Sequence, residues 1–258
     1  MRLHSSALAL LSLLPGLVSL PLGGGPESPI HFVPIDGTAI AITFDACATP
    51  SQAYGFDRAV FETLKREQVP ATIFVSGRWV EGHADVMAEL AAEPLIEFGD
   101  HSYDHPHMIA LLPPQMEREI DQTEAALARF GKKGVAFRPP YGEWNLAVLQ
   151  MLARKKLPAV LWDVVSGDPS VGTTAAGILR TVLKKTRPGS IIVFHINGRG
   201  WKTAEAMPSV ISELRLRGFR FVHVSEMLAA RQTAHPPPRP PSPPPSPSPV
   251  FDALVPSR

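Results

Sequence analysis

Short apolar segments rich in β-branched residues alternate with helical patterns through residues 30–232 of this 258-residue chain. Continuous apolar runs are typical of strands buried on both faces, and their alternation with helices favours a parallel sheet covered by helices. Seven strands are predicted, at 38–44, 71–75, 95–98, 135–137, 159–162, 190–194 and 219–222. Helices are predicted at 58–67, 83–92, 115–130, 145–155, 174–186 and 204–217. The pattern predicts an α/β fold, and periodicity alone leaves a barrel and a doubly wound sheet open.

The first 25 residues differ from this central domain. Arg2 and His4 precede an apolar run from Ala7 to Leu20, and small residues follow it. A short basic start, an apolar segment and small residues afterwards are typical of a signal peptide. The run is shorter and more broken than the about 20 residues of a membrane span. The sequence therefore predicts a signal peptide at 1–25 and an exported protein, secreted or in the cell envelope; a helix of the mature fold is the alternative.

Residues 233–258 are rich in proline, which fixes φ and removes backbone donors. This composition predicts an extended tail outside the fold, either a spacer or a disordered end. The folded domain is then expected at 30–232. A formal net charge of +1 gives no sign of a nucleic-acid partner. The single cysteine, Cys47, cannot form an internal disulfide, so the domain must be stabilised by its core.

Ionisable residues follow five of the seven predicted strands. These residues are Asp45, His101 with His105, Arg138, Asp163 with Asp168, and His195. The carboxyl ends of parallel strands meet at one edge of an α/β fold, which is where binding and catalysis take place in such proteins. Polar residues of purely structural use would be scattered over both ends of the strands. The pattern therefore indicates an enzyme.

Two histidines, His101 and His105, have the i, i+4 spacing that places both imidazoles on one face of a helix-like turn, where they can bind one metal ion. The alternative is a pair of surface histidines. His107, which follows a proline, is expected to be a bystander. For His195 the alternative is a histidine that merely ends a strand. Arg138 precedes Pro-Pro-Tyr, a rigid turn that could hold its guanidinium against a carboxylate, and the alternative is a surface arginine.

Taken in order, several segments resemble the polysaccharide deacetylases with a NodB homology domain, carbohydrate esterase family 4. The matching segments are 43–45, 70–77, 97–106, 137–142, 162–163, 168 and 188–195, within a stretch of roughly 39–228. The resemblance implies a distorted (β/α)7 barrel of the NodB type. It also implies a hydrolase that removes N-acetyl groups from an acetylated polysaccharide, such as peptidoglycan or chitin-like oligomers. The same groups could cleave an O-acetyl ester.

The resemblance also implies a mechanism. Asp45 would be the general base that activates the attacking water. His101 and His105 would bind a divalent ion, usually Zn²⁺, that polarises the acetyl carbonyl and lowers the pKa of the water. His195 would be the general acid that protonates the amine leaving group.

Three further residues would support these groups. Arg138 would orient the base, and Asp168 would hold the general acid. The backbone N–H of Tyr141 would stabilise the oxyanion of the tetrahedral intermediate.

The chain departs from the family pattern at its first motif. The family usually has two adjacent aspartates there, the second a metal ligand, whereas this chain has Ala46 in the sequence Thr-Phe-Asp-Ala-Cys. Asp45, a thiolate from Cys47, Asp104 or additional waters could replace the missing ligand. Cys47 could equally be a small core residue.

A second departure follows Asp168, where the tryptophan that lines the sugar groove is missing and a proline stands instead. Trp144 or Trp201 could replace that surface. The missing metal ligand keeps open a non-catalytic glycan-binding protein on a deacetylase barrel, and a hydrolase of small amides is a third alternative.

Overall fold

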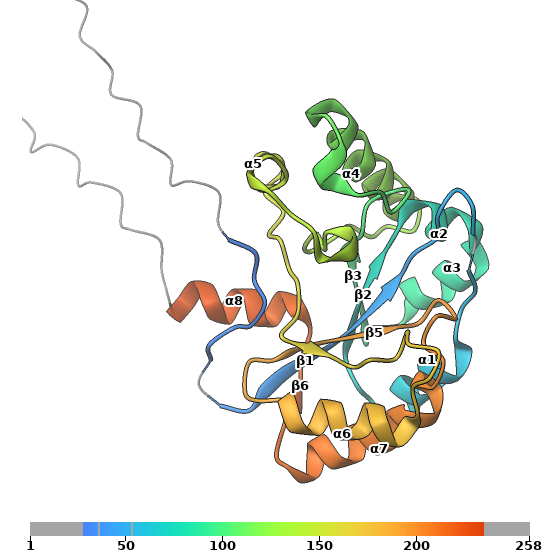
Figure 1. Ribbon diagram of the computed structural model, residues 1–258, viewed down its shortest axis with the longest axis vertical. Coiled ribbons are helices and arrows are strands. Elements are labelled where there is room, and N and C mark those ends of the chain that lie inside the picture. Colours follow the sequence, from blue (N-terminus) through green and yellow to red (C-terminus); the bar gives the residue numbers. More distant parts are fainter. Residues whose placement is uncertain (1–27, 36, 53, 235–258) are drawn as a thin grey trace, which may run out of the picture.

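The computed structural model describes residues 28–35, 37–52 and 54–234 (Figure 1). The predicted signal peptide at 1–25 and the proline-rich tail beyond residue 234 lie outside the described residues. No helix in the described ranges is long and apolar enough to cross a membrane.

A six-stranded parallel sheet forms the centre of the fold (Figure 1). Its strands run in the order β3-β2-β1-β5-β4, and β6 pairs with the start of β1. The bounds are β1 Ala39–Ala46, β2 Ala71–Val75, β3 Ile96–Asp100, β4 Val164–Val165, β5 Ile191–His195 and β6 Arg220–Phe221. The register places Asp45 beside His195, both at the carboxyl ends of their strands. The predicted α/β class with a parallel sheet is confirmed.

Helices cover the sheet. Their bounds are α1 Arg58–Arg66, α2 Gly77–Gly82, α3 Ala84–Ala92, α4 Pro113–Ala128, α5 Leu146–Lys155, α6 Ala175–Lys185, α7 Thr203–Leu216 and α8 Val224–Ala234. Short 3₁₀ turns lie at Met108–Ala110 and Pro140–Gly142. All six predicted helices form within two residues of their expected ends. The sequence did not predict α2 and α8; α2 is only one and a half turns long and begins where the Ser76 hydroxyl accepts from the Trp79 N–H.

Two predicted strands, 135–137 and 159–162, do not form regular strands. They make isolated parallel bridges, from Asp100 to Phe137, from Phe137 to Ala159 and from Ile30 to Val160. Pro139 lies two residues after the end of the first segment, and Pro158 directly precedes the second. Proline has no backbone N–H to donate to the hydrogen bonds of a sheet. The bridges continue the sheet beyond β3, and the regular strands do not close into a hydrogen-bonded ring.

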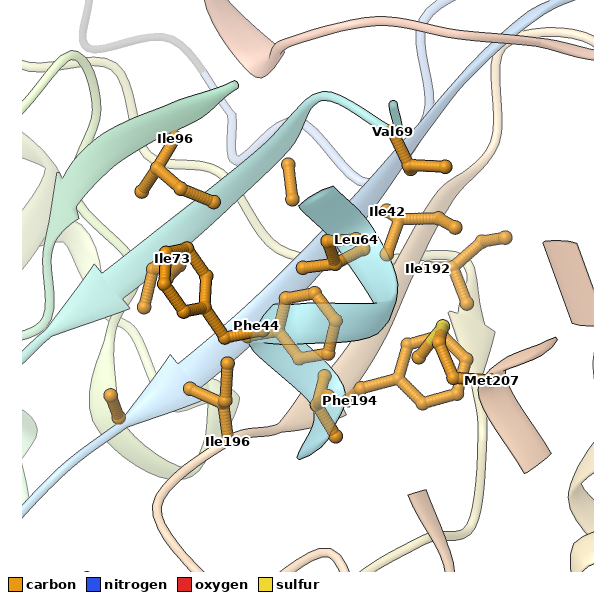
Figure 2. Packing of buried hydrophobic residues seen from close by; sticks show 14 of the residues in the cluster. Ile42, Phe44, Leu64, Val69, Ile73, Ile96, Ile192, Phe194, Ile196 and Met207 are labelled. Atoms are coloured by element: carbon orange, nitrogen blue, oxygen red, sulfur yellow. The ribbon is translucent and has the colours of Figure 1, made fainter. Parts of the chain in front are cut away.

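The two faces of β1 have different environments. Ile40, Ile42, Phe44 and Ala46 belong to the main hydrophobic cluster beneath the helices, where Figure 2 shows Phe44 near Phe194. The centroids of those two rings lie 5.8 Å apart. Burying one large apolar side chain contributes about 1.5–3 kcal/mol, so this face anchors the strand. Since side chains alternate along a strand, the odd-numbered residues face the opposite way, toward the site described next.

Candidate active site

A cavity of about 210 Å³ lies at the carboxyl ends of β1, β3 and β5. Its lining residues are Asp45, Cys47, His101, His105, Tyr141, Trp162, Val165, Ser166, Asp168, Pro169, Val193, His195 and Arg199. Six of the seven predicted site residues are among them. The seventh, Arg138, is fully buried against Asp45. The structure thus brings all seven together, and their roles remain predictions.

Asp45 and Arg138 form a buried ion pair beside the cavity. Nη1 of Arg138 donates to Oδ1 of Asp45 at 2.7 Å, and Nη2 donates to Oγ1 of Thr43 at 2.9 Å. Two backbone carbonyls of the 159–162 segment accept further bonds, and the guanidinium stacks over the ring of Phe74 with Cζ 3.9 Å from the ring centroid. A buried charge is tolerated only when it is paired and hydrogen-bonded in this way. The arginine therefore fixes the orientation of the carboxylate.

The same pair determines the ionisation of Asp45. Burial alone would raise the pKa of its carboxyl group, but the charge of Arg138, with smaller effects of His101, His195 and the Arg138 hydrogen bond, lowers the pKa below its ordinary value. The side chain is therefore a carboxylate at neutral pH, with one oxygen held by the guanidinium.

His101 and His105 are both buried, with ring centroids 4.8 Å apart and ring planes inclined by 74°. Nδ1 of His101 lies 2.6 Å from the carbonyl oxygen of Arg138, and Nε2 lies 3.8 Å from Oδ2 of Asp45. A carbonyl oxygen only accepts, so Nδ1 carries the proton and Nε2 of the neutral ring carries the lone pair.

Both histidines have a lowered pKa. Burial is the main cause in each, and for His105 burial and the neighbouring His101 lower the pKa to about 3. The two rings are therefore neutral at neutral pH, which is the form that binds a metal ion.

The predicted helical turn between the two histidines is wrong. The segment is irregular, and two of its residues, Ser102 and His105, have left-handed φ angles of 62° and 56°. The Ser102 hydroxyl accepts from the His105 N–H at 3.1 Å, and Oδ1 of Asp100 accepts from the Ser102 N–H at 2.8 Å. Positive φ at residues other than glycine is uncommon and clusters at functional sites. The imidazoles meet because of this turn and not because of helical spacing.

Glu119 of α4 supports this turn from behind. Its Oε2 accepts from the backbone N–H groups of Tyr103 and Asp104 at 2.9 and 2.8 Å. We expect Glu119→Ala to lower the free energy of unfolding by about 1–3 kcal/mol, because two backbone donors lose a half-buried charged acceptor. The variant should also weaken metal binding, since the loop between the histidines is freed.

Urea unfolding and metal titration measure both effects. Glu117→Ala is the matched control on the same helix, because the exposed side chain of Glu117 pairs with Lys155 of α5 and does not bond to the turn. Equal losses in the two variants would contradict a supporting role for Glu119.

His195 is held by Asp168, which is fully buried. Oδ1 of Asp168 lies 3.0 Å from Nδ1 of His195, and Oδ2 accepts from the His195 N–H at 2.7 Å. The hydroxyls of Ser166 and Thr203 donate to the same carboxylate at 3.0 and 2.7 Å. Four donors thus fix the carboxylate, and the carboxylate fixes the ring with its Nε2 edge free for the cavity.

Asp163 does not belong to the site, although it follows a predicted strand. Its carboxylate accepts from the hydroxyl of Ser190 and from the N–H of Ile191, at the amino end of β5. This aspartate therefore anchors a strand at the far end of the sheet.

Comparison with known proteins assigns the chain to a family. The profile of the family described as polysaccharide deacetylase matches residues 33–160. A chitooligosaccharide deacetylase of Rhizobium leguminosarum bv. trifolii is 30% identical over 209 residues, which cover 75% of this chain and 93% of that protein. The chain belongs to the polysaccharide deacetylase family.

Other relatives differ in length and in what is known of them. A peptidoglycan-N-acetylglucosamine deacetylase of Bacillus cereus is 29% identical over 197 residues, 75% of this chain and 70% of that protein. The uncharacterised protein YlxY of Bacillus subtilis is 30% identical over 167 residues, which span 64% of this chain and only half of YlxY.

Solved structures of this deacetylase family include both enzymes and a pseudoenzyme. The Bc1960 peptidoglycan N-acetylglucosamine deacetylase has a TM-score of 0.70 at 28% identity, covering 77% of this chain and 91% of that one. BA3943, a CE4 family pseudoenzyme from Bacillus anthracis, has a TM-score of 0.70 at 25% identity, covering 79% and 69%. A mutant of BA3943 with restored enzymatic activity has also been solved.

Side chains alternate along β1 and separate Ala46 from its two neighbours. Ala46 is fully buried in the hydrophobic cluster, whereas Asp45 and Cys47 line the cavity. The Nδ2 group of Asn197 lies 3.4 Å from the Cys47 sulfur, and burial and the charge of Asp45 raise the pKa of the thiol to about 11. The free cysteine is therefore a neutral thiol. In the described ranges, no group of three or more His, Cys, Asp or Glu side chains is arranged to hold a metal ion.

The rim of the cavity contains residues that the sequence did not predict. The ring of Tyr141 stacks on His107 with centroids 4.2 Å apart, and His107 is fixed by Glu143 at 2.8 Å. His107 thus contacts a cavity residue without lining the cavity itself, and its lack of a role in the site stays a prediction. Trp162, quoted in the sequence only as part of a family motif, lines the cavity, while Trp144 and Trp201 are exposed and do not line it. Arg199 also lines the cavity and was not predicted. The one sequence signal that could have found it is its position four residues after His195.

Proposed function

We propose that this chain hydrolyses N-acetyl groups on a glycan as an exported, divalent-metal-dependent deacetylase. The observation that carries the proposal is the placement of two side chains at one cavity, each held by a buried partner: Asp45 by Arg138, and His195 by Asp168. A base and an acid, each held by its own partner, suit a hydrolysis in which one group takes a proton from water and the other gives a proton to the leaving nitrogen. Similarity to deacetylases of chitooligosaccharides and of peptidoglycan N-acetylglucosamine supports N-acetylated glycans as the substrate class.

The residues fit a divalent ion such as Zn²⁺, although with fewer ligands than is usual. His101 and His105 would hold the ion, because both rings are neutral and Nε2 of His101 has its lone pair free. The hydrogen bond from Nδ1 of His101 to a backbone carbonyl is the outer-shell support that metal-binding histidines commonly have. Asp45 is the nearest carboxylate, with Oδ2 3.8 Å from His101. Such an ion, when bound, polarises an acetyl carbonyl and makes a nearby water more acidic.

The chain's own residues would move the protons. Oδ2 of Asp45 would accept a proton from the attacking water, while Arg138 holds Oδ1. The water oxygen adds to the acetyl carbon, and the backbone N–H of Tyr141 would donate to the oxyanion that forms. Nε2 of His195 would then donate a proton to the amide nitrogen as the C–N bond breaks, which releases acetate and leaves an amine.

A non-catalytic glycan-binding protein is the second candidate. The observation that favours it is Ala46, which lies in the hydrophobic cluster at the position where the family resemblance implies a metal-ligating aspartate. The similarity to a CE4 family pseudoenzyme supports it as well. Against it stands the complete set of base, acid and both their partners, which a binding protein does not need.

Metal binding separates the two candidates. We expect the purified full chain to bind one Zn²⁺ per molecule, and His101→Ala to bind at least about tenfold more weakly, because one of two imidazole ligands is lost. Elemental analysis and competition with a chelating dye measure this. His223→Ala is the matched control, since His223 bonds to the carbonyl of Leu95 at the other end of β3. Absence of zinc from wild type, under conditions that load a known zinc enzyme, would favour the binding protein.

Export rests on the pattern in residues 1–25. We propose that this segment is removed and that the mature chain acts in the cell envelope or outside the cell. Mass spectrometry of the N-terminus of the protein recovered from culture medium and envelope fractions tests this. A chain that retains Met1 and stays with cytoplasmic markers would contradict it.

A further inference from the structure

Arg199 lies in the loop between β5 and α7, four residues after His195. It lines the same cavity as Asp45, His105 and Tyr141 and is half-buried. None of the steps proposed above uses it. A guanidinium at this point faces whatever part of a substrate lies beside the acetamido group.

The backbone on both sides of Arg199 is tied to the body of the protein. Nδ2 of Asn197 donates to the carbonyl of Cys47 at 2.8 Å, and the carbonyl of Asn197 accepts from the Gly55 N–H at 3.0 Å. Asn197 itself is fully buried. On the other side, the Trp201 N–H donates to the carbonyl of Asp168 at 3.1 Å.

Gly200 allows this close approach. A Cβ atom at Gly200 would lie 2.7 Å from the carbonyl oxygen of His195 and 2.8 Å from Oδ2 of Asp168, closer than real Cβ contacts allow. The loop that presents Arg199 is therefore packed directly on the His195–Asp168 pair. A residue on such a fixed backbone is pre-organised for recognition.

The charges around the cavity are paired, with Arg199 as the exception. Asp45 is paired with Arg138, and Asp168 with His195. Within the described ranges no carboxylate is paired with Arg199. Its guanidinium lies beside the ring of Tyr54, whose centroid is 5.6 Å from Cζ. Its guanidinium donors are thus available to a ligand.

We infer that Arg199 is a specificity-determining residue that selects glycans with a carboxylate close to the acetamido group. The inference rests on the proposed function, because it needs the acetamido group between Asp45 and His195. The planar fork of a guanidinium matches a carboxylate through two parallel hydrogen bonds, which a hydroxyl or ester of the same sugar cannot form. Such a carboxylate has two possible sources, the lactyl ether of a muramic acid without its peptide, or C6 of a uronic acid.

Matched oligosaccharides test the inference. One probe alternates N-acetylglucosamine and N-acetylmuramic acid with free lactyl carboxylates, and its neutral partner is the methyl ester of the same chain. A second probe replaces the muramic acid by glucuronic acid. Binding to the full chain is measured by calorimetry, and kcat/KM by acetate release, each at low and high salt.

We expect wild type to bind one of the acids at least about tenfold more tightly than the neutral ester. Arg199→Gln should bring this ratio close to one, Arg199→Lys should keep part of it, and added salt should reduce it. Arg220→Gln is the control, because Arg220 lies on β6 beside the start of β1, away from the cavity. The acid that shows the preference identifies the source of the carboxylate.

Two results would overturn the inference: equal binding of acid and ester by wild type, or an equal loss for both probes in Arg199→Gln. The proposed function fails separately. If no probe releases acetate, the hydrolase is contradicted, while the binding ratio still decides the role of Arg199.

Discussion

Arg138→Met is expected to lower the free energy of unfolding by about 3 kcal/mol or more, because it breaks a buried ion pair. The substitution leaves the carboxylate of Asp45, whose side chain is only 8% exposed, without its partner. Removing one member of a buried ion pair costs about 3–5 kcal/mol, and the lower end applies because Asp45 borders a cavity. Thr43 also loses its contact with the guanidinium.

The loss should depend on pH. In wild type the pKa of Asp45 is lowered, so its contribution to stability is fully present above the unfolded pKa of about 3.9 and is lost as pH falls through the folded pKa. Without Arg138, burial raises the pKa of Asp45 instead. The folded variant then binds a proton more readily than the unfolded chain, so its free energy of unfolding rises as the pH falls from 7. The difference between the two proteins should therefore shrink from pH 7 toward pH 4.

Urea unfolding of wild type and variant at both pH values measures these quantities. Arg58→Met is the matched control, because Arg58 pairs with Glu89 at 2.8 Å on the surface, where both side chains are more than one-third exposed. An exposed pair contributes about 0–1 kcal/mol. A similar loss in Arg58→Met and Arg138→Met, or a loss that does not change with pH, would contradict the description of the buried pair.

Asp45→Asn should have the largest effect on activity, a fall in kcat of about 10²–10⁴-fold, since the amide cannot accept the proton of the attacking water. The side chain keeps its size and can still accept a hydrogen bond from Arg138 through its carbonyl oxygen. The substrate should therefore still bind, with KM changed much less than kcat.

Asp163→Asn is the control for this substitution. Asp163 is also a largely buried carboxylate, but it anchors β5 through Ser190 and Ile191 and does not line the cavity. We expect it to lower stability and to leave kcat close to that of wild type. Loss of kcat in Asp163→Asn to the same degree, or its retention in Asp45→Asn, would contradict the assignment of Asp45 as the base.

The sheet could be predicted from the sequence where strands are long and buried on both faces. β1, β2 and β5 are continuous apolar runs and appear at the expected places. The segments at 135–137 and 159–162 have the same composition but are bounded by prolines, so they contribute isolated bridges. The regular β4 is only two residues long, at Val164–Val165, which is too short for a periodic pattern to reveal.

The site could be predicted as far as topology determines it. Residues that end parallel strands must meet at one edge, and Asp45, His101 and His195 do so. The turn that joins the two histidines could not be predicted, because its left-handed residues, Ser102 and His105, follow no periodic pattern. Part of its support comes from Glu119 of α4, which accepts from the backbone between them. The place of Arg199 at the cavity could not be predicted, because nothing in the sequence marks it except its nearness to His195.

The direction of Ala46 shows how a small error in strand length matters. The predicted strand ended at residue 44, which left the directions of residues 46 and 47 undetermined. The observed strand continues to Ala46, so alternation places Ala46 in the hydrophobic cluster and Cys47 at the cavity. Which of the two residues faces the cavity thus depends on where one strand ends.

Acetate release tests directly whether this chain is a glycan deacetylase. The full chain, with Zn²⁺, Co²⁺ or Ni²⁺ added after removal of bound metal, is incubated with N-acetylated and O-acetylated oligosaccharides, and acetate and new amines are both quantified. We predict acetate and amine in equal amounts from an N-acetylated glycan, with release abolished by a chelator and reduced at least about 10²-fold in Asp45→Asn. Binding of these glycans without acetate release under any of the metals would contradict it and would establish a glycan-binding protein instead.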